Sequence, residues 1–331
     1  MKIYLGLIAL FIASISFAQP GQFNDTLVPV HDPVITRQDS TYYVFSTGQG
    51  INVYSSTDMK HWKKESPVFS SAPQWAVQTI PGFRGHIWAP DISYHNGTYY
   101  LYYSVSAFGK NTSCIGVATN KTLNPAAPGF KWIDHGKVIQ SVPGRDMWNA
   151  IDPNLVRDEK GVPWLVFGSF WNGMKLVQLD TSLKSVAQPE QWYTVAARKR
   201  DFVLPDSVAG DAAIEAPFIY RHGKYFYLFT SFDYCCRGEK STYKMVVGRS
   251  EKVQGPYVDK DGVPMNLGGG STLLEGDKDW NSVGHNAVAG FNGTDYLVFH
   301  AYDAADKGRS KLRFEKLAWI NDWPVVGWRP R

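Results

Sequence analysis

Apolar and polar positions along the chain repeat in five similar units. Each unit opens with a short apolar run, passes through a polar turn and continues into a run of aromatic and β-branched residues. The turn positions are Asp39-Ser40, Asn96-Gly97, Lys160-Gly161, His222-Gly223 and Asn292-Gly293. Two such runs joined by a tight turn predict a β-hairpin. The pattern therefore predicts an all-β chain with one hairpin in every unit.

Two more strands are expected after each hairpin. The third strand is predicted at the apolar stretches 51–54, 115–118, 174–179, 243–247 and 312–317. Aromatic residues beyond these stretches are expected to mark a fourth, outermost strand, and they are Trp62, Trp132, Trp192, Tyr257 and Trp319. Four antiparallel strands repeated around an axis are typical of a β-propeller. The prediction is thus a five-bladed β-propeller over residues 19–331, with a β-sandwich or a β-helix as the alternative.

The first strand of every unit starts beside a side chain that can do chemistry. Asp32 and Asp152 directly precede a proline, Glu215 stands one residue further ahead of one, and Trp88 and His285 occupy the comparable places in the second and fifth units. In a propeller the first strands line the central channel, so these side chains should meet. Proline restricts the residue before it to extended backbone, which predicts rigidly aimed side chains.

Three carboxyl groups in one cleft favour acid–base chemistry. Neighbouring like charges raise the pKa of at least one carboxyl group, so that an acid can stand beside a base. One group can then protonate a leaving oxygen while another activates water, as glycoside hydrolysis requires. The sequence contains no Gly-x-Ser-x-Gly elbow, so a serine triad is not indicated.

The first eighteen residues have the pattern of a secretory signal peptide. Lys2 precedes an apolar run over residues 3–13, and Ser16 and Ala18 flank Phe17 before an expected cleavage after Ala18. The apolar run is too short to span a bilayer, so we expect a secreted or periplasmic protein without a membrane segment. The formal charge of +4 is spread without a basic block, which argues against a nucleic-acid partner.

Three cysteines, Cys114, Cys235 and Cys236, leave several pairings open. The adjacent pair can close a vicinal disulfide, one of the two can reach Cys114, or all three can be buried thiols. The sequence does not choose among these arrangements.

Four motifs together resemble glycoside hydrolase family 43, in particular its endo-1,5-α-L-arabinanases. They are His31-Asp32-Pro33, Gly85-His86-Ile87-Trp88-Ala89-Pro90-Asp91, Trp148-Asn149-Ala150-Ile151-Asp152-Pro153 and Ile214-Glu215-Ala216-Pro217. Further similarity lies at Ser231 to Gly238, at Gly284-His285-Asn286 and at Leu317-Ala318-Trp319. The similarity runs in the same order through nearly the whole mature chain.

The resemblance implies an inverting hydrolase that cleaves internal α-1,5-L-arabinofuranosyl linkages of arabinan, a polysaccharide of pectin side chains. Asp32 would be the general base that activates water, and Glu215 the general acid that protonates the glycosidic oxygen. Asp152 would orient Glu215 and keep its pKa high. In an inverting enzyme the two working carboxyl groups stand roughly 6.5–9.5 Å apart.

The resemblance also implies substrate contacts and a metal. Trp88 would offer its indole face to a sugar ring, and Phe108, Asn149 and Ser169 would line the neighbouring subsites. His285 would face a calcium ion whose other ligands are mostly waters, which is unusual because calcium prefers oxygen ligands. We expect a monomer.

Other functions remain open at this stage. An exo-acting arabinofuranosidase or a β-xylosidase of the same family would need a cleft that is blocked at one end. A glycan-binding propeller without catalysis would not need all three carboxyl groups. Fructan hydrolases also use Asp-Pro-Asn, but near their first strand, whereas Asp152-Pro153-Asn154 falls in the third unit.

Overall fold

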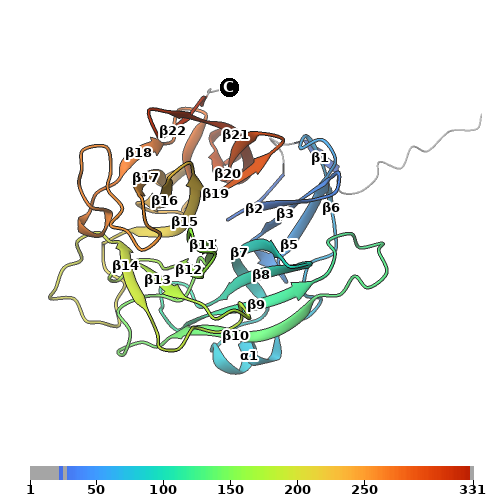
Figure 1. The fold of residues 1–331 in the computed structure, drawn as a ribbon, viewed down its shortest axis with the longest axis horizontal. Helices are drawn as coiled ribbons and strands as arrows, with labels where there is room; N and C mark the ends of the chain where they lie inside the picture. Colours follow the sequence, from blue (N-terminus) through green and yellow to red (C-terminus); the bar gives the residue numbers. More distant parts are fainter. Residues whose placement is uncertain (1–21, 25–27, 329–331) are drawn as a thin grey trace, which may run out of the picture.

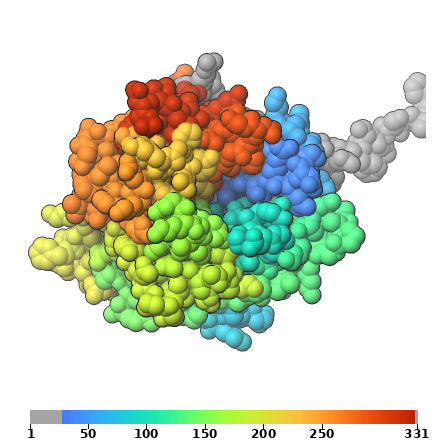
Figure 2. All heavy atoms as spheres, viewed as in Figure 1, coloured from blue at the N-terminus to red at the C-terminus, as the bar shows by residue number. Residues whose placement is uncertain are grey.

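The computed structural model describes residues 22–24 and 28–328, which form five antiparallel sheets arranged around a central axis (Figure 1). This confirms the predicted all-β, five-bladed β-propeller. In Figure 2 the blades follow one another around the molecule in chain order, from blue to red. The predicted signal peptide, residues 1–18, lies outside the described residues. Among the described residues, no helix has the length and apolar character needed to cross a membrane.

The strands of each blade are nearly consecutive in sequence. Blade 1 contains β1 (Gln22–Asn24), β2 (Val34–Gln38), β3 (Thr41–Ser46), β5 (Asn52–Ser56) and β6 (His61–Lys64). Blade 2 contains β4 (Gly48–Gln49), β7 (His86–His95), β8 (Thr98–Val105), β9 (Ser113–Asn120) and β10 (Ile133–Ser141). Blade 3 contains β11 (Asn154–Arg157), β12 (Pro163–Phe167), β13 (Met174–Gln178) and β14 (Trp192–Ala196). Blade 4 contains β15 (Ile214–His222), β16 (Tyr225–Phe232), β17 (Lys244–Ser250) and β18 (Ser271–Leu274). Blade 5 contains β19 (Trp280–Phe291), β20 (Thr294–Asp303), β21 (Arg309–Ile320) and β22 (Trp323–Val326).

Short helical turns occupy the connections between strands. They are α1 (Gln74–Thr79), η1 (Gly238–Lys240), η2 (Met265–Leu267) and η3 (Ala304–Asp306). The five predicted hairpins are all present, and their turns explain the Asn-Gly pairs. Asn96 and Gly97 have φ values of 47° and 73°, and Asn292 and Gly293 have 52° and 77°. Two successive positive φ angles match the twist of the flanking strands, which is why Asn and Gly are favoured there.

The prediction that an aromatic residue marks the fourth strand is wrong in blades 4 and 5. Trp319 lies inside β21, the third strand, and the turn to β22 follows it at Asn321 and Asp322. Tyr257 is 1% exposed and packs in the core, while the outermost strand β18 begins only at Ser271. Aromatic residues are common both in strands and in the buried contacts between blades, so an aromatic residue alone does not locate a strand.

The ring closes through the N-terminal segment of the described chain. Pro29 forms a β-bridge with Lys311, and the Leu312 N–H donates to the carbonyl of Val28, so this segment crosses from blade 1 to β21. Trp62 of blade 1 stacks on Phe314 of blade 5 with ring centroids 5.6 Å apart. Blades 1 and 5 therefore share one apolar core.

A backbone kink stands at the start of the first strand in all five blades. The five equivalent residues have left-handed φ values between 41° and 59°, and they are Asp32, Ala89, Asp152, Ala216 and His285. The extended conformation expected before proline was therefore wrong. Within β7, β15 and β19 the strand register shifts at this point, as in a β-bulge. Bulges re-aim side chains beside functional sites, and here they turn the chain toward the axis.

Each kink is held by a side chain from the preceding blade. The backbone N–H groups of the five kink residues donate, in order, to His300 Nδ1, Thr47 Oγ1, Ser104 Oγ, Asp152 Oδ2 and Ser231 Oγ, at 2.8–3.2 Å. Left-handed backbone costs energy for a residue other than glycine and persists only where its surroundings fix it. These hydrogen bonds between neighbouring blades provide that constraint, and they fix the kinked backbone of the five blades relative to one another.

Candidate active site

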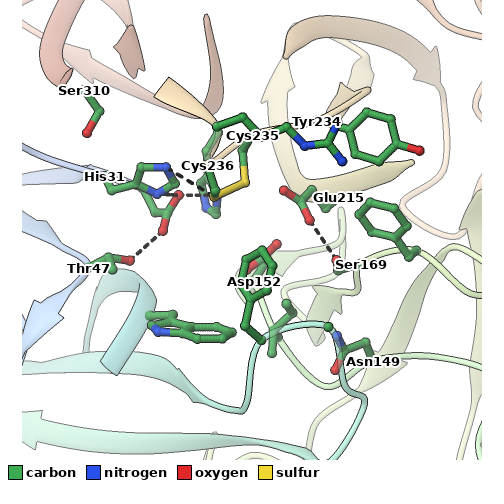
Figure 3. A pocket seen from close by; sticks show the side chains of 18 of the residues that line it. His31, Thr47, Asn149, Asp152, Ser169, Glu215, Tyr234, Cys235, Cys236 and Ser310 are labelled. Atoms are coloured by element: carbon green, nitrogen blue, oxygen red, sulfur yellow. Dashed lines mark hydrogen bonds and ion pairs between the residues drawn. A yellow bond between two sulfur atoms is a disulfide. The ribbon is translucent and has the colours of Figure 1, made fainter. Parts of the chain in front are cut away.

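The kinks surround one cavity of about 910 Å³ at the end of the axis (Figure 3). All eight site residues predicted from the sequence line it, namely Asp32, Trp88, Phe108, Asn149, Asp152, Ser169, Glu215 and His285. In Figure 3, His31 and Thr47 lie on one side of the cavity, and Glu215 and Ser169 lie on the other. The fold therefore brings together carboxyl groups from three separate blades.

Asp32 is surrounded by hydrogen-bond donors. Its Oδ1 atom lies 2.7 Å from His31 Nδ1 and 2.9 Å from His285 Nδ1, and its Oδ2 atom accepts from the Thr47 hydroxyl at 2.5 Å. Burial alone would raise the pKa of Asp32, but the charges and hydrogen bonds of His31 and His285 hold it well below its ordinary value. Asp32 is therefore an ionised carboxylate at neutral pH.

His285 is the cationic partner of Asp32. Burial opposes its charged form, but the carboxylate of Asp32 outweighs burial and raises the pKa of His285 to about 9. The pair is therefore charged on both sides at neutral pH, which stabilises a buried carboxylate that would otherwise be costly.

His31 is held through both of its ring nitrogens. The Cys236 N–H donates to the Tyr302 hydroxyl at 2.9 Å, and that hydroxyl lies 2.8 Å from His31 Nε2. Because an ionised carboxylate only accepts hydrogen bonds, the 2.7 Å contact between His31 Nδ1 and Asp32 Oδ1 places an imidazole proton on Nδ1. On this assignment His31 donates to the carboxylate.

Glu215 is held through both of its oxygens. The Tyr243 hydroxyl donates to Oε1 at 2.6 Å, and the Ser169 hydroxyl donates to Oε2 at 2.8 Å. Tyr243 is fully buried, and its pKa is raised well above the ordinary value, first by burial and then by the nearby carboxyl groups. Tyr243 therefore stays a hydrogen-bond donor at any working pH.

Asp152 lines the same cavity as the other two carboxyl groups, and its pKa is perturbed. Burial is the largest cause that raises its pKa, to about 8, and the charges of Glu215 and Asp32 act in the same direction. The group is therefore mostly protonated at neutral pH. Its Oδ2 atom accepts from the Ala216 N–H at 3.2 Å, which ties it to the kink directly after Glu215.

The residues predicted for the subsites line the cavity with different exposure. Trp88 is half-buried, and its indole N–H donates to His86 Nδ1 at 3.0 Å. Phe108 is 80% exposed at the rim. Asn149 is buried; its side-chain amide donates to the carbonyl of Lys110 at 3.4 Å, while its Oδ1 atom has no hydrogen-bond partner among the described residues.

Of the three cysteine arrangements that the sequence left open, the structure shows the vicinal disulfide. Cys235 and Cys236 are joined and line the cavity wall. Cys114 is a buried free thiol whose pKa is raised to about 12 by burial. The disulfide therefore belongs to the site, while Cys114 belongs to the core of blade 2.

The residues around His285 do not form a calcium cage. Two groups of described residues bring three potential ligand atoms together, His31 with Cys235 and Cys236, and His31 with Asp32 and His300. Neither group contains His285, and only Asp32 offers oxygen, whereas calcium takes roughly six to eight oxygen ligands. His285 Nδ1 already faces Asp32. A calcium ion there would depend mostly on water ligands.

Several residues that build the site were not predicted from the sequence. Thr47 and Tyr302 support the Asp32 side, and Tyr243 supports Glu215. A signal for some of them does exist: a polar residue follows the second-strand aromatic run in every unit. These residues are Thr47, Ser104, Ser231 and His300, together with Ser169, which was already predicted, and each contacts a carboxyl group or a kink.

Taken together, a five-bladed propeller and an axial cavity lined by three carboxyl groups define the class of β-propeller glycoside hydrolases. The chain belongs to glycosyl hydrolases family 43, because the sequence profile of that family matches residues 28–324.

Known proteins of two kinds are similar to this chain. The extracellular exo-α-(1→5)-L-arabinofuranosidase ArbA of Cellvibrio japonicus (strain Ueda107) is 54% identical over 90% of this chain and 86% of its own length. The extracellular endo-α-(1→5)-L-arabinanase 1 of Bacillus subtilis (strain 168) is 40% identical over 96% and 93%. The structure of Cellvibrio cellulosa α-L-arabinanase complexed with arabinohexaose superimposes with a TM-score of 0.89 at 54% identity, and the match covers 90% of this chain and 95% of that one.

Proposed function

We propose that this chain hydrolyses α-1,5-linked arabinan by a single displacement, with Asp32 as general base and Glu215 as general acid. The observation that carries the proposal is the contrast between the two carboxyl groups in one cavity. Asp32 is kept ionised by two histidines, whereas Glu215 is held by two neutral hydroxyl groups. Carboxyl groups with contrasting environments can take the base and acid roles of glycoside hydrolysis.

Asp32 is suited to take a proton from water. Its carboxylate is fixed by three side chains, so it stays aimed into the cavity while the water approaches the sugar. When the proton moves to Asp32, the charge that His285 compensates disappears from the carboxylate. The cost of that step is set by the same ion pair that holds the carboxylate in place.

Glu215 is suited to lose a proton to the glycosidic oxygen. The hydroxyl groups of Tyr243 and Ser169 stabilise the carboxylate that remains after the transfer, because hydrogen bonds to an ionised acceptor are stronger than those to a neutral one. Asp152 acts as a positioning residue through the Ala216 N–H. Its raised pKa keeps Asp152 mostly neutral at neutral pH, so that it adds little negative charge beside the acid. The role of Asp152 in keeping the pKa of Glu215 high stays a prediction of the family resemblance.

The position of cleavage along the polymer is a finer proposal. The motifs predicted internal cleavage, whereas the higher identity to the exo-named relative, 54% against 40% for the endo-named one, favours release from a chain end. Both modes break the same linkage with the same residues. We therefore propose α-1,5 hydrolysis with release from a chain end as the mode that the relatives favour.

Time-resolved product analysis on debranched linear arabinan tests both levels of the proposal. Release from a chain end gives one short product from the first minutes and a slow loss of viscosity. Internal cleavage gives a ladder of oligosaccharides and a fast loss of viscosity. No soluble product at any time, with folded protein shown by circular dichroism, would contradict arabinan hydrolysis itself.

Calcium at His285 stays a prediction of the family resemblance. If it is correct, incubation with a chelator followed by desalting should lower kcat on arabinan, and added calcium should restore it, because the ion would add positive charge beside the carboxyl groups. His285→Gln should remove the response to calcium. Unchanged kcat and an unchanged thermal midpoint after chelation would contradict the prediction.

A further inference from the structure

A second cavity lies outside the axial site, at the junction of blades 2 and 3. It is a groove of about 550 Å³ lined by Trp148, Trp192, three aliphatic residues and five polar or charged residues. None of these residues lines the axial cavity. The groove is bounded by β10 of blade 2 and by the segment that leads into β14 of blade 3.

Two tryptophans form an aromatic wall of the groove. The rings of Trp148 and Trp192 lie 5.3 Å apart at an angle of 39°, and both contact Phe167 edge-on. The Trp192 indole N–H donates to Glu190 Oε2 at 2.7 Å, which fixes the ring further. Both tryptophans remain only half-buried. Large, rigid aromatic rings with a polar edge suit ligands that are apolar on one face and polar at their rim.

The polar side chains of the groove suit a neutral ligand with many hydroxyl groups. Gln140, Gln188, Glu190 and the Arg145–Asp146 pair supply amide, carboxylate and guanidinium groups around the tryptophans. Such groups can donate to and accept from hydroxyls. Arg145 and Lys137, whose ammonium group donates to Gln140 Oε1 at 2.6 Å, balance the charges of Asp146 and Glu190. The groove therefore has no net positive charge that would attract a polyanion such as a nucleic acid or a polyuronate. A neutral sugar chain can stack on the tryptophan rings and form hydrogen bonds to the polar side chains without bringing a charge of its own.

The groove is joined to the axial cavity by one short chain segment. Trp148 in the groove directly precedes Asn149 in the cavity. The side-chain amide of Asn111 donates to the carbonyl groups of Asp146 and Trp148 at 2.9 and 3.3 Å, which pins this segment between the two sites. A polymer that is cut in the cavity is therefore the nearest candidate for the groove.

We propose that this groove is a second binding site for a neutral arabinan chain, which holds polymer outside the cavity where cleavage occurs. The proposal rests on the proposed function, because the ligand is the same polymer. It assigns Trp148 and Trp192 to stacking on sugar rings, and Gln188 and Glu190 to hydroxyl groups. A short oligosaccharide that only fills the cavity gains nothing from the groove.

The test compares polymer with short substrate in groove variants. For Trp192→Ala we expect the ratio of kcat/KM on linear arabinan to kcat/KM on α-1,5-arabinotriose to fall roughly tenfold, since an aromatic anchor typically contributes this much to binding. Tyr193→Ala is the matched control, because Tyr193 is the next residue of β14 but packs on Trp164 outside the groove. In that variant the ratio should equal the wild-type value.

Each outcome separates the two proposals. If wild type, Trp192→Ala and Tyr193→Ala cleave both substrates with equal ratios of kcat/KM, the groove is not a binding site for arabinan, while the proposed function stands. A wild-type protein that cleaves neither substrate would overturn the proposed function and the groove with it. If Trp192→Ala fails to fold, Gln188→Ala at the exposed rim gives the same comparison. Its ratio should fall in the same direction, and a wild-type ratio would count against the groove.

Discussion

Replacement of Asp32 by asparagine should lower kcat on arabinan by roughly 10²–10⁴-fold, the usual contribution of a general base. Asparagine has nearly the same shape, and its carbonyl oxygen can still accept from His31 or His285, so the fold should persist. It cannot take a proton from water at neutral pH. The measurement is the initial rate at saturating substrate, together with the thermal midpoint by circular dichroism.

A second carboxyl group of the same blade provides the control. Asp39 lies in the exposed β2–β3 turn with φ of 54°, a conformation that asparagine adopts readily. Asp39→Asn should therefore retain wild-type kcat and stability. If Asp32→Asn keeps most of its activity, another group must activate water, and the assignment of Asp32 is wrong. If both variants lose activity together with their thermal midpoint, the loss reflects unfolding.

The hairpins could be predicted from the sequence because their signals are local. The Asn-Gly pair at Asn96-Gly97 and the aromatic run after it depend on backbone angles and strand propensity within a few residues. Repetition at similar spacing then predicted that Asp32, Asp152 and Glu215 converge. The propeller needed no information about which side chains touch, because its axis follows from the repeat alone.

The kinks and their partners could not be predicted in the same way. A residue before proline is normally extended, and only the bonds from neighbouring blades hold Asp32 and Asp152 in left-handed backbone. These bonds join residues that are 48 and 268 positions apart, so no local pattern reports them. The pairing of Tyr243 with Glu215 is equally non-local.

The mode of cleavage could not be predicted from the sequence for a different reason. Internal and terminal attack use the same carboxyl groups and differ in which loops close the ends of the cleft. Motifs around Asp32 and Glu215 report the chemistry that both modes share. These motifs do not include the residues of the rim, where Phe108 and Ala209 border the cavity.

Replacement of Glu215 by alanine should lower kcat/KM on arabinan roughly 10²–10⁴-fold, and the loss should depend on the leaving group. A sugar hydroxyl is a poor leaving group and needs the proton that Glu215 supplies. A dinitrophenolate leaves without one, so an arabinobioside with this aglycone should lose far less activity. Asp32→Asn should impair both substrates to a similar degree, because water must be activated in either case.

This pattern distinguishes an acid from a residue that only maintains the cavity. Glu239→Ala, which removes an exposed carboxyl group of the same blade, should leave both substrates at wild-type rates. Equal losses on both substrates in Glu215→Ala would contradict the acid role and point to a structural one. Tyr243→Phe should show the same dependence on the leaving group in weaker form, because its hydroxyl stabilises the carboxylate that forms only when Glu215 has given up its proton.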